Sequence, residues 1–466
     1  MKQFKDAASK LSSLGANKSK GVAEENDALC NGEEATTSVW TTGQEFQFYV
    51  PWLWDEIPEQ PRDKLHPNRQ VIRIPRPTDI PGFTEEFRDH WIEESVISAV
   101  KELVHDEEHY VTCTERQLKE GHYDQSKAWR HFNIVQSKCD LPEASVPGCD
   151  GVLPVEMTIV VKEVSIRRQQ TPSCLEWLTL PSPGKCIERI KNQVRIYLTP
   201  DCSMHIHIRP QTTLEFDLQS FKKMASLLWL AEERLDKLYH PARNNPYSPF
   251  HRSLRRCSNL AQDKDPDITG RPDDYSAVLG PVTLPAAEKV KLARIWQAFD
   301  RHQLRELLRI HPNTGKHDYP AYNFFNLFMA SDKQTIEFRK TESTIDAQVI
   351  DAWIEVFLLL TDFCMTCSVE EFQRIMENLG KSDNVYTTWH LLRDVGCKNL
   401  TVEVLKQKFM QQWLPEDSDS RPASRAATST STLSSNSVTR LRLRDAIRDG
   451  TEKIGGKIAG GYSYGR

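Results

Sequence analysis

The chain lacks the features of a membrane or secreted protein. No apolar run approaches the roughly 20 residues of a transmembrane helix, and no signal peptide is recognisable. The 11 cysteines are odd in number and scattered, so they do not suggest a disulfide framework. These absences predict reduced thiols, no membrane partner and a cytoplasmic location, with the nucleus as the alternative compartment.

Local motifs for nucleotide binding or nucleophilic catalysis are missing as well. Neither standard glycine-rich phosphate loop occurs, and no glycines support a nucleophile elbow. The net charge of −5 and the pI near 6.3 give no basis for expecting a nucleic-acid partner. Candidate site residues must therefore come from polar side chains on the expected strands and helices.

Both ends of the chain have a composition typical of disorder. Residues 1–38 are rich in Lys, Ser, Ala, Glu and Asn and have little apolar content. Residues 413–466 combine a low-complexity Ser/Thr stretch with a basic segment that includes Arg440, Arg444 and Lys457. We expect one folded domain at 39–412. The basic segment either folds on a protein partner or remains a solvated tail.

Hydrophobic periodicity between the two tails predicts an α+β domain with a mostly antiparallel sheet and helices on one face. Strands are expected at 43–50, 71–74, 131–136, 155–161, 204–209, 322–328 and 334–339. Helices are expected at 84–103, 186–197, 217–238, 286–308 and 346–360, with a further helical pair to 413.

The strand expected at 204–209 has the clearest alternation. Aliphatic residues at 204, 206 and 208 alternate with His205, His207 and Arg209, so imidazoles and guanidinium share one face. Asp217 is a good N-cap for the following helix, whose apolar stripe runs from Phe221. This helix is expected to pack on the aliphatic face, leaving the histidines toward a cleft.

Two more strands carry polar side chains two residues apart. These pairs are Glu45 with Gln47 and Glu337 with Arg339, and each pair lies on one strand face. Each pair alone is also typical of a solvated strand face. If these strands and the histidine strand belong to one sheet, the shared face can bind Mg²⁺ or Mn²⁺ through carboxylates and stabilise phosphate through arginine.

Longer segments around these pairs resemble a known family. Residues 202–259 contain Met-His-Ile-His and Leu-Tyr-His-Pro-Ala-Arg-Asn-Asn-Pro-Tyr, and residues 335–346 read Thr-Ile-Glu-Phe-Arg-Lys-Thr-Glu-Ser-Thr-Ile-Asp. These segments, with Gly-Gln-Glu-Phe-Gln-Phe at 43–48, resemble the amidoligase family that is widespread in fungi. The likeness spans residues 40–365 and implies the glutamine synthetase-like fold of carboxylate–amine ligases.

The resemblance implies ATP-dependent formation of an amide from a carboxylate and an amine through an acyl-phosphate. It implies that Glu45, His205 and Glu337 bind Mg²⁺ or Mn²⁺. His207 and Arg339 are implied as catalytic residues, and Arg339 also as a contact of ATP. The substrates implied are a small-molecule or peptide carboxylate and an amine, whose identities are not legible.

Two residues after the long helix are also implied in cofactor binding. Arg243 and Asn245 match the family's residues at this place and are expected to reach nucleotide or substrate. The same pattern equally fits a helix C-terminal cap with a turn before Pro246.

Departures from the family pattern concern residues expected to face the ligand. Gln47 replaces a second glutamate, and an amide is a poorer ligand for a hard cation. Ser203 and Ser343 stand where the family favours glycine. Of the pattern expected at 129–166, Trp129 is present, Glu156 and Glu163 both compete for the glutamate position, and the expected Asp and Ser-Pro are not found. The alternatives are an inactive binding or regulatory relative and a metal-dependent hydrolase that uses His205 and His207.

Overall fold

The computed structural model describes residues 37–56, 69, 71–77, 84–104, 133–137, 149–168, 173–178, 181–199, 201–211, 216–246, 248, 251–264, 278–280, 283–310, 319–327 and 334–413. Nearly all of both predicted tails lies outside these ranges, and so does Trp129. The described part begins in a strand at Thr37 and ends in a helix at Trp413.

The described strands form one eight-stranded sheet with the central order β3-β4-β1-β6-β8-β7. All neighbouring pairs are antiparallel except β1 and β2, and β5 adds to the outer side of β4. The mostly antiparallel α+β architecture is therefore confirmed. The strands are β1 (Thr37–Trp54), β2 (Ile72–Ile74), β3 (Asn133–Gln136), β4 (Gly151–Arg167), β5 (Cys174–Trp177), β6 (Ser203–Pro210), β7 (Tyr322–Asn323) and β8 (Ile336–Glu342).

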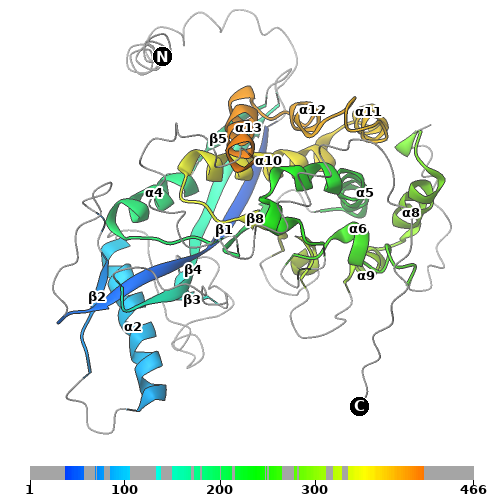
Figure 1. The fold of residues 1–466 in the computed structure, drawn as a ribbon. Helices are drawn as coiled ribbons and strands as arrows, with labels where there is room; N and C mark the ends of the chain where they lie inside the picture. Colours follow the sequence, from blue (N-terminus) through cyan, green and yellow to red (C-terminus); the bar gives the residue numbers. More distant parts are fainter. Residues whose placement is uncertain are drawn as a thin grey trace, which may run out of the picture.

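Some of the described helices contact this sheet directly, and others pack on helices. Figure 1 shows α2 beside β2 and β3 at one end, and α5 with α6, α8 and α9 at the other. The helices are α2 (Glu85–Val104), α4 (Pro183–Gln193), α5 (Leu218–Leu235), α6 (Leu254–Cys257), α8 (Ala286–Gln297), α9 (Arg301–Leu308), α10 (Ala347–Thr366), α11 (Val369–Leu379), α12 (Thr388–Asp394) and α13 (Asn399–Trp413). None of the described helices is both long and apolar enough to span a bilayer.

The core lies between the sheet and the buried helix α10. Phe338 of β8 stacks on Phe357 with ring centroids 4.2 Å apart, and Trp353 follows at 5.5 Å from Phe357. Tyr239 continues this column at 5.1 Å from Trp353. Asp346 begins α10 as predicted, since its carboxylate accepts from the Gln348 amide at 3.0 Å. The apolar face of the strands is thus closed by aromatic rings.

Four sequence predictions need correction. The helix expected at 286–308 is two helices, because Asp300 has extended backbone and caps α9 by accepting from the Gln303 amide at 2.7 Å. The strand expected at 322–328 ends at Asn323 and is followed by the 3-10 turn η4 (Phe325–Leu327). The helix expected at 186–197 begins at Pro183 and ends at Gln193, and three helices replace the pair after α10.

Candidate metal centre

The face of the sheet turned away from α10 carries Glu45, His205, His207 and Glu337, and we call it the open face, although the last three residues are each 4% exposed. Strands far apart in the sequence supply its polar groups. In the β1–β6 ladder, Glu45 lies opposite His205, and Gly43 lies opposite His207. In the β6–β8 ladder, His207 lies opposite Glu337. Because Gly43 has no side chain, the His207 imidazole reaches diagonally across the strand to Glu45. The three strands therefore bring together the carboxylates and imidazoles that the alternation predicted.

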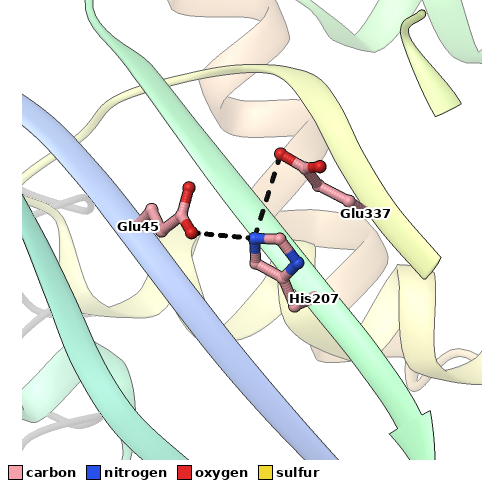
Figure 2. A group of neighbouring side chains, drawn as sticks. All are labelled: Glu45, His207 and Glu337. Atoms are coloured by element: carbon pink, nitrogen blue, oxygen red, sulfur yellow. Dashed lines mark hydrogen bonds and ion pairs between the residues drawn. The ribbon is translucent and has the colours of Figure 1, made fainter. Parts of the chain in front are cut away.

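Glu45 bridges both histidines. Its Oε2 lies 3.1 Å from His205 Nδ1, and its Oε1 lies 3.1 Å from His207 Nε2. Glu337 Oε1 approaches the same nitrogens at 3.7 Å and 3.9 Å. Figure 2 shows Glu45, His207 and Glu337 converging from three strands.

One ligand atom each from Glu45, His207 and Glu337 lie within 4.8 Å of one another. This spacing allows one ion to be bound by all three after small side-chain adjustments. The histidine of the compact group is thus His207, which we expected as a catalytic residue. His205, which we expected as the ligand, lies beside the group and shares its Glu45 contact.

The protonation states fit a cation. Burial opposes ionisation of Glu337, but Arg339 and the two histidines outweigh it and lower the pKa of the carboxyl to about 2. Burial, reinforced by Arg339, lowers the pKa of His205 to about 4. A carboxylate and a neutral imidazole are the forms that bind metals. The ionised Glu337 carboxyl therefore suits a divalent ion, with the neutral His205 imidazole beside it.

A second layer of contacts orients this group. Asn323 donates from Nδ2 to Glu337 Oε2 at 2.7 Å, and Thr335 Oγ1 lies 3.2 Å from His207 Nδ1. Partners of this kind fix the rotamer and tautomer of a ligand residue. The sequence analysis missed both residues. Thr335 belongs to the quoted Thr-Ile-Glu motif, which was the available signal.

Arg339 completes the cluster on the β8 side. Its Nη1 forms an ion pair with Glu337 Oε1, and its guanidinium carbon lies 4.4 Å from the ring centroid of Tyr319. The side chain of Arg339 is 12% exposed. A guanidinium at the rim of a carboxylate–imidazole group can bind the oxygens of a phosphate.

Gln47 and Glu156 form a separate pair on the β1–β4 side. Gln47 Nε2 donates to Glu156 Oε2 at 2.9 Å, and Gln47 Oε1 accepts from the Ser203 amide at 3.1 Å. Burial and the charge of Glu45 raise the pKa of Glu156 to about 7. Of the two glutamates weighed from sequence, Glu156 therefore borders the site. Glu163 lies farther along β4, where it accepts from Gln211 at 3.0 Å.

Arg243 and Asn245 are not part of the carboxylate–histidine group. Arg243 is 3% exposed and donates to the carbonyls of Asp201, Arg339 and Lys340 and to Ser203 Oγ; these bonds measure 3.2, 3.1, 3.2 and 2.8 Å. It therefore fastens the adjoining ends of β6 and β8. Asn245 is exposed and ends the 3-10 turn η3 (Pro241–Asn244). The long helix itself ends at Leu235 with Asp236 as its C-cap, so neither residue caps it; Asn245 instead ends the short turn before Pro246.

Comparison with known proteins adds no assignment to this geometry. No protein-family model matches the sequence, no curated protein matches the chain, and no solved structure matches the fold. Functional inference therefore depends on the arrangement of side chains on the open face of the sheet.

Proposed function

We propose that the open face binds a divalent metal ion through Glu45, His207 and Glu337 and places nucleotide phosphates beside Arg339. The observation that carries this proposal is the convergence of three ligand atoms within 4.8 Å from three strands. Two carboxylates and one imidazole suit Mn²⁺, and the carboxylate oxygens also suit Mg²⁺. Arg339 supplies the positive charge that a phosphate requires.

We propose ATP-dependent formation of an amide from a carboxylate and an amine as the reaction. Metal-bound ATP would supply the phosphoryl group that activates the carboxylate. Arg339 would stabilise charge on the oxygens of the transferred group. Glu45 would keep His205 and His207 oriented toward the centre through its two 3.1 Å contacts. The sequence likeness to amidoligases and the antiparallel sheet with helices on one face support this reaction class.

A second candidate is a relative that binds metal and nucleotide without catalysis. The observation that favours it is that both ends of the Gln47 side-chain amide bond within the protein. Its Nε2 donates to Glu156 at 2.9 Å, and its Oε1 accepts from the Ser203 backbone N–H at 3.1 Å. In this chain that position offers no carboxylate for a second cation. Binding at Glu45, His207 and Glu337 does not depend on it.

Calorimetric titration of Mn²⁺, followed by Mn²⁺–ATP, tests the binding proposal. Glu337→Gln preserves the shape of the side chain and removes its charge, so we expect Mn²⁺ affinity to fall about 100-fold. Glu163→Gln is the matched control, because Glu163 lies on the same sheet outside the group. Equal Mn²⁺ binding by wild type and Glu337→Gln would remove Glu337 from the site.

A turnover assay separates the two candidates. ADP release is measured with pools of carboxylates and amines, each supplied alone and then together. Release that requires both pools supports the ligase. Tight Mn²⁺–ATP binding with no release under any combination supports the binding protein.

A further inference from the structure

The ring of Tyr319 lies against the guanidinium of Arg339. The guanidinium carbon lies 4.4 Å from the ring centroid, and the tyrosine is 37% exposed. The Arg339 backbone is already fixed, because its amide donates to the Ala321 carbonyl at 2.9 Å and its carbonyl accepts from Arg243 Nη2 at 3.1 Å. The Arg339 side chain is held by its ion pair with Glu337 and by the ring of Tyr319.

Tyr319 is itself held in place by its neighbours in the fold. The Arg252 amide donates to the Tyr319 carbonyl at 2.8 Å, and Arg252 forms a parallel bridge with Pro320. The next residue, Ala321, returns a 2.8 Å bond from its amide to the Arg252 carbonyl. These bonds fix the backbone from which the Tyr319 ring reaches Arg339.

A stacked guanidinium behaves differently from a free one. The ring attracts its flat face, and the N–H groups in its plane then point sideways, in the geometry that bidentate hydrogen bonding uses. One of them already pairs with Glu337. Without the ring, the cation would be drawn further over Glu337 and Glu45, since carboxylates are the strongest anions nearby. That movement would remove positive charge from the phosphate side.

We infer that Tyr319 is a positioning residue for the proposed nucleotide site. Its ring keeps the Arg339 guanidinium at the rim of the metal centre, with in-plane N–H groups directed to anionic phosphate oxygens. This inference rests on the proposed function. It assigns Tyr319 to phosphate recognition and leaves metal binding to Glu45, His207 and Glu337.

Calorimetry with Mn²⁺ alone and with Mn²⁺–ATP tests the inference on three variants. Tyr319→Ala should weaken Mn²⁺–ATP binding about fivefold while Mn²⁺ affinity stays within about twofold. Tyr319→Phe keeps the ring and should bind like wild type. Phe325→Ala is the matched control. Phe325 is 51% exposed near the same edge, and its ring is 5.9 Å from Arg305, outside the site.

The possible results distinguish a failure of the inference about Tyr319 from a failure of the proposed metal and nucleotide site. If wild type binds Mn²⁺–ATP and Tyr319→Ala binds it equally well, the inference about Tyr319 is wrong and the proposed function stands. The same holds if Tyr319→Phe or Phe325→Ala loses as much Mn²⁺–ATP affinity as Tyr319→Ala. If wild type binds Mn²⁺–ATP no more tightly than Glu337→Gln does, both the inference about Tyr319 and the proposed function are wrong. As a ligand-free check, the Arg339 Nε–H resonance in ¹⁵N spectra should shift in Tyr319→Ala and stay in place in Tyr319→Phe. An unchanged resonance in the alanine variant contradicts the stacking.

Discussion

The two sides of the sheet hold carboxylates in different ways, one on helix α10 and the other on the strands themselves. Toward the helices, Asp362 is fully buried, yet it accepts from Ser38 Oγ at 2.6 Å, Trp40 Nε1 at 3.0 Å and Arg168 Nε at 2.8 Å. A buried carboxylate with this many donors is a stable structural element.

On the open face, three carboxylates lie close together: Glu45, Glu156 and Glu337. Glu156 receives one side-chain hydrogen bond from Gln47 and lies near the charge of Glu45, so its pKa rises to about 7. Glu45 and Glu337 share the same two histidines. Clustered ionisable groups with shifted pKa values are typical of binding sites. One face thus stabilises the fold, and the other is the face that we propose binds a cation.

The largest expected effect is a loss of stability from a substitution on the side of the sheet that faces α10. Phe338→Ala removes a ring stacked on Phe357 at 4.2 Å, and we expect the free energy of unfolding to fall by about 3–5 kcal/mol. Denaturant unfolding measures this loss, and Phe338→Leu should show a smaller one. Because neighbouring Glu337 points to the other face, Mn²⁺ affinity of the folded variant should stay unchanged. A weakened Mn²⁺ affinity would show that the two faces are coupled.

Arg243 tests whether a charged residue near the site belongs to structure or to ligand binding. Arg243→Met removes a side-chain donor from three backbone carbonyls, one in a buried bond and two in part-buried bonds, so we expect a loss of about 2–4 kcal/mol in the free energy of unfolding. Mn²⁺–ATP affinity of the folded protein should not change. Reduced affinity at unchanged stability would return Arg243 to the cofactor-binding set.

Glu156 gives the open face a pH dependence of its own. Its pKa is about 7 in the fold against 4.5 for an ordinary glutamate. Between these values the folded chain holds a proton that the unfolded chain has released, so this group makes stability fall as pH rises. Glu156→Gln should therefore gain about 1–3 kcal/mol over wild type at pH 8 and little at pH 4.

Denaturant unfolding without metal measures the effect of Glu156→Gln at several pH values. Thr158→Val, two residues along the same strand, carries no ionisable group and serves as the control. A constant difference between Glu156→Gln and wild type across the pH range would contradict the proposed titration. His205 acts in the opposite sense, since its pKa of about 4 makes stability fall as pH drops below 6.5.

Alternation in the sequence was enough to predict which residues share a face. A strand turns successive side chains to opposite sides, so His205 with His207 and Glu337 with Arg339 had to lie together. Periodicity does not say which strands are neighbours. The registers that place Glu45 beside His205 and His207 beside Glu337 are long-range pairings, and the choice of His207 for the compact group depends on Gly43 across the ladder.

Other errors came from local signals that compete with periodicity. The apolar pattern at 286–308 continues through Asp300, whose carboxylate instead begins a new helix. Arg243 matched a family motif, but its role depends on carbonyls at 201, 339 and 340 that only the folded chain brings together. A sequence likeness can locate a charged residue near a site without showing which groups it contacts.

Gln47→Glu is expected to have the smallest effect on stability. It tests most directly whether the carboxylates of the open face bind one cation together. The new carboxylate still accepts from the Ser203 amide but replaces a donor to Glu156 with a like charge. Without metal we expect the free energy of unfolding to fall by about 1 kcal/mol. With Mn²⁺ we expect affinity to rise several-fold, because the added charge favours a cation. Calorimetry and denaturant unfolding on the same preparation measure both.

Gln47→Met provides the control for Gln47→Glu, because it removes both hydrogen bonds without adding charge. It should lose stability and gain no Mn²⁺ affinity. If Gln47→Glu also gains none, the carboxylates of the open face do not act together on one cation. The crowding of Glu45, Glu156 and Glu337 would then be a structural cost that no ligand relieves, and the contrast between the two faces would lose its functional meaning.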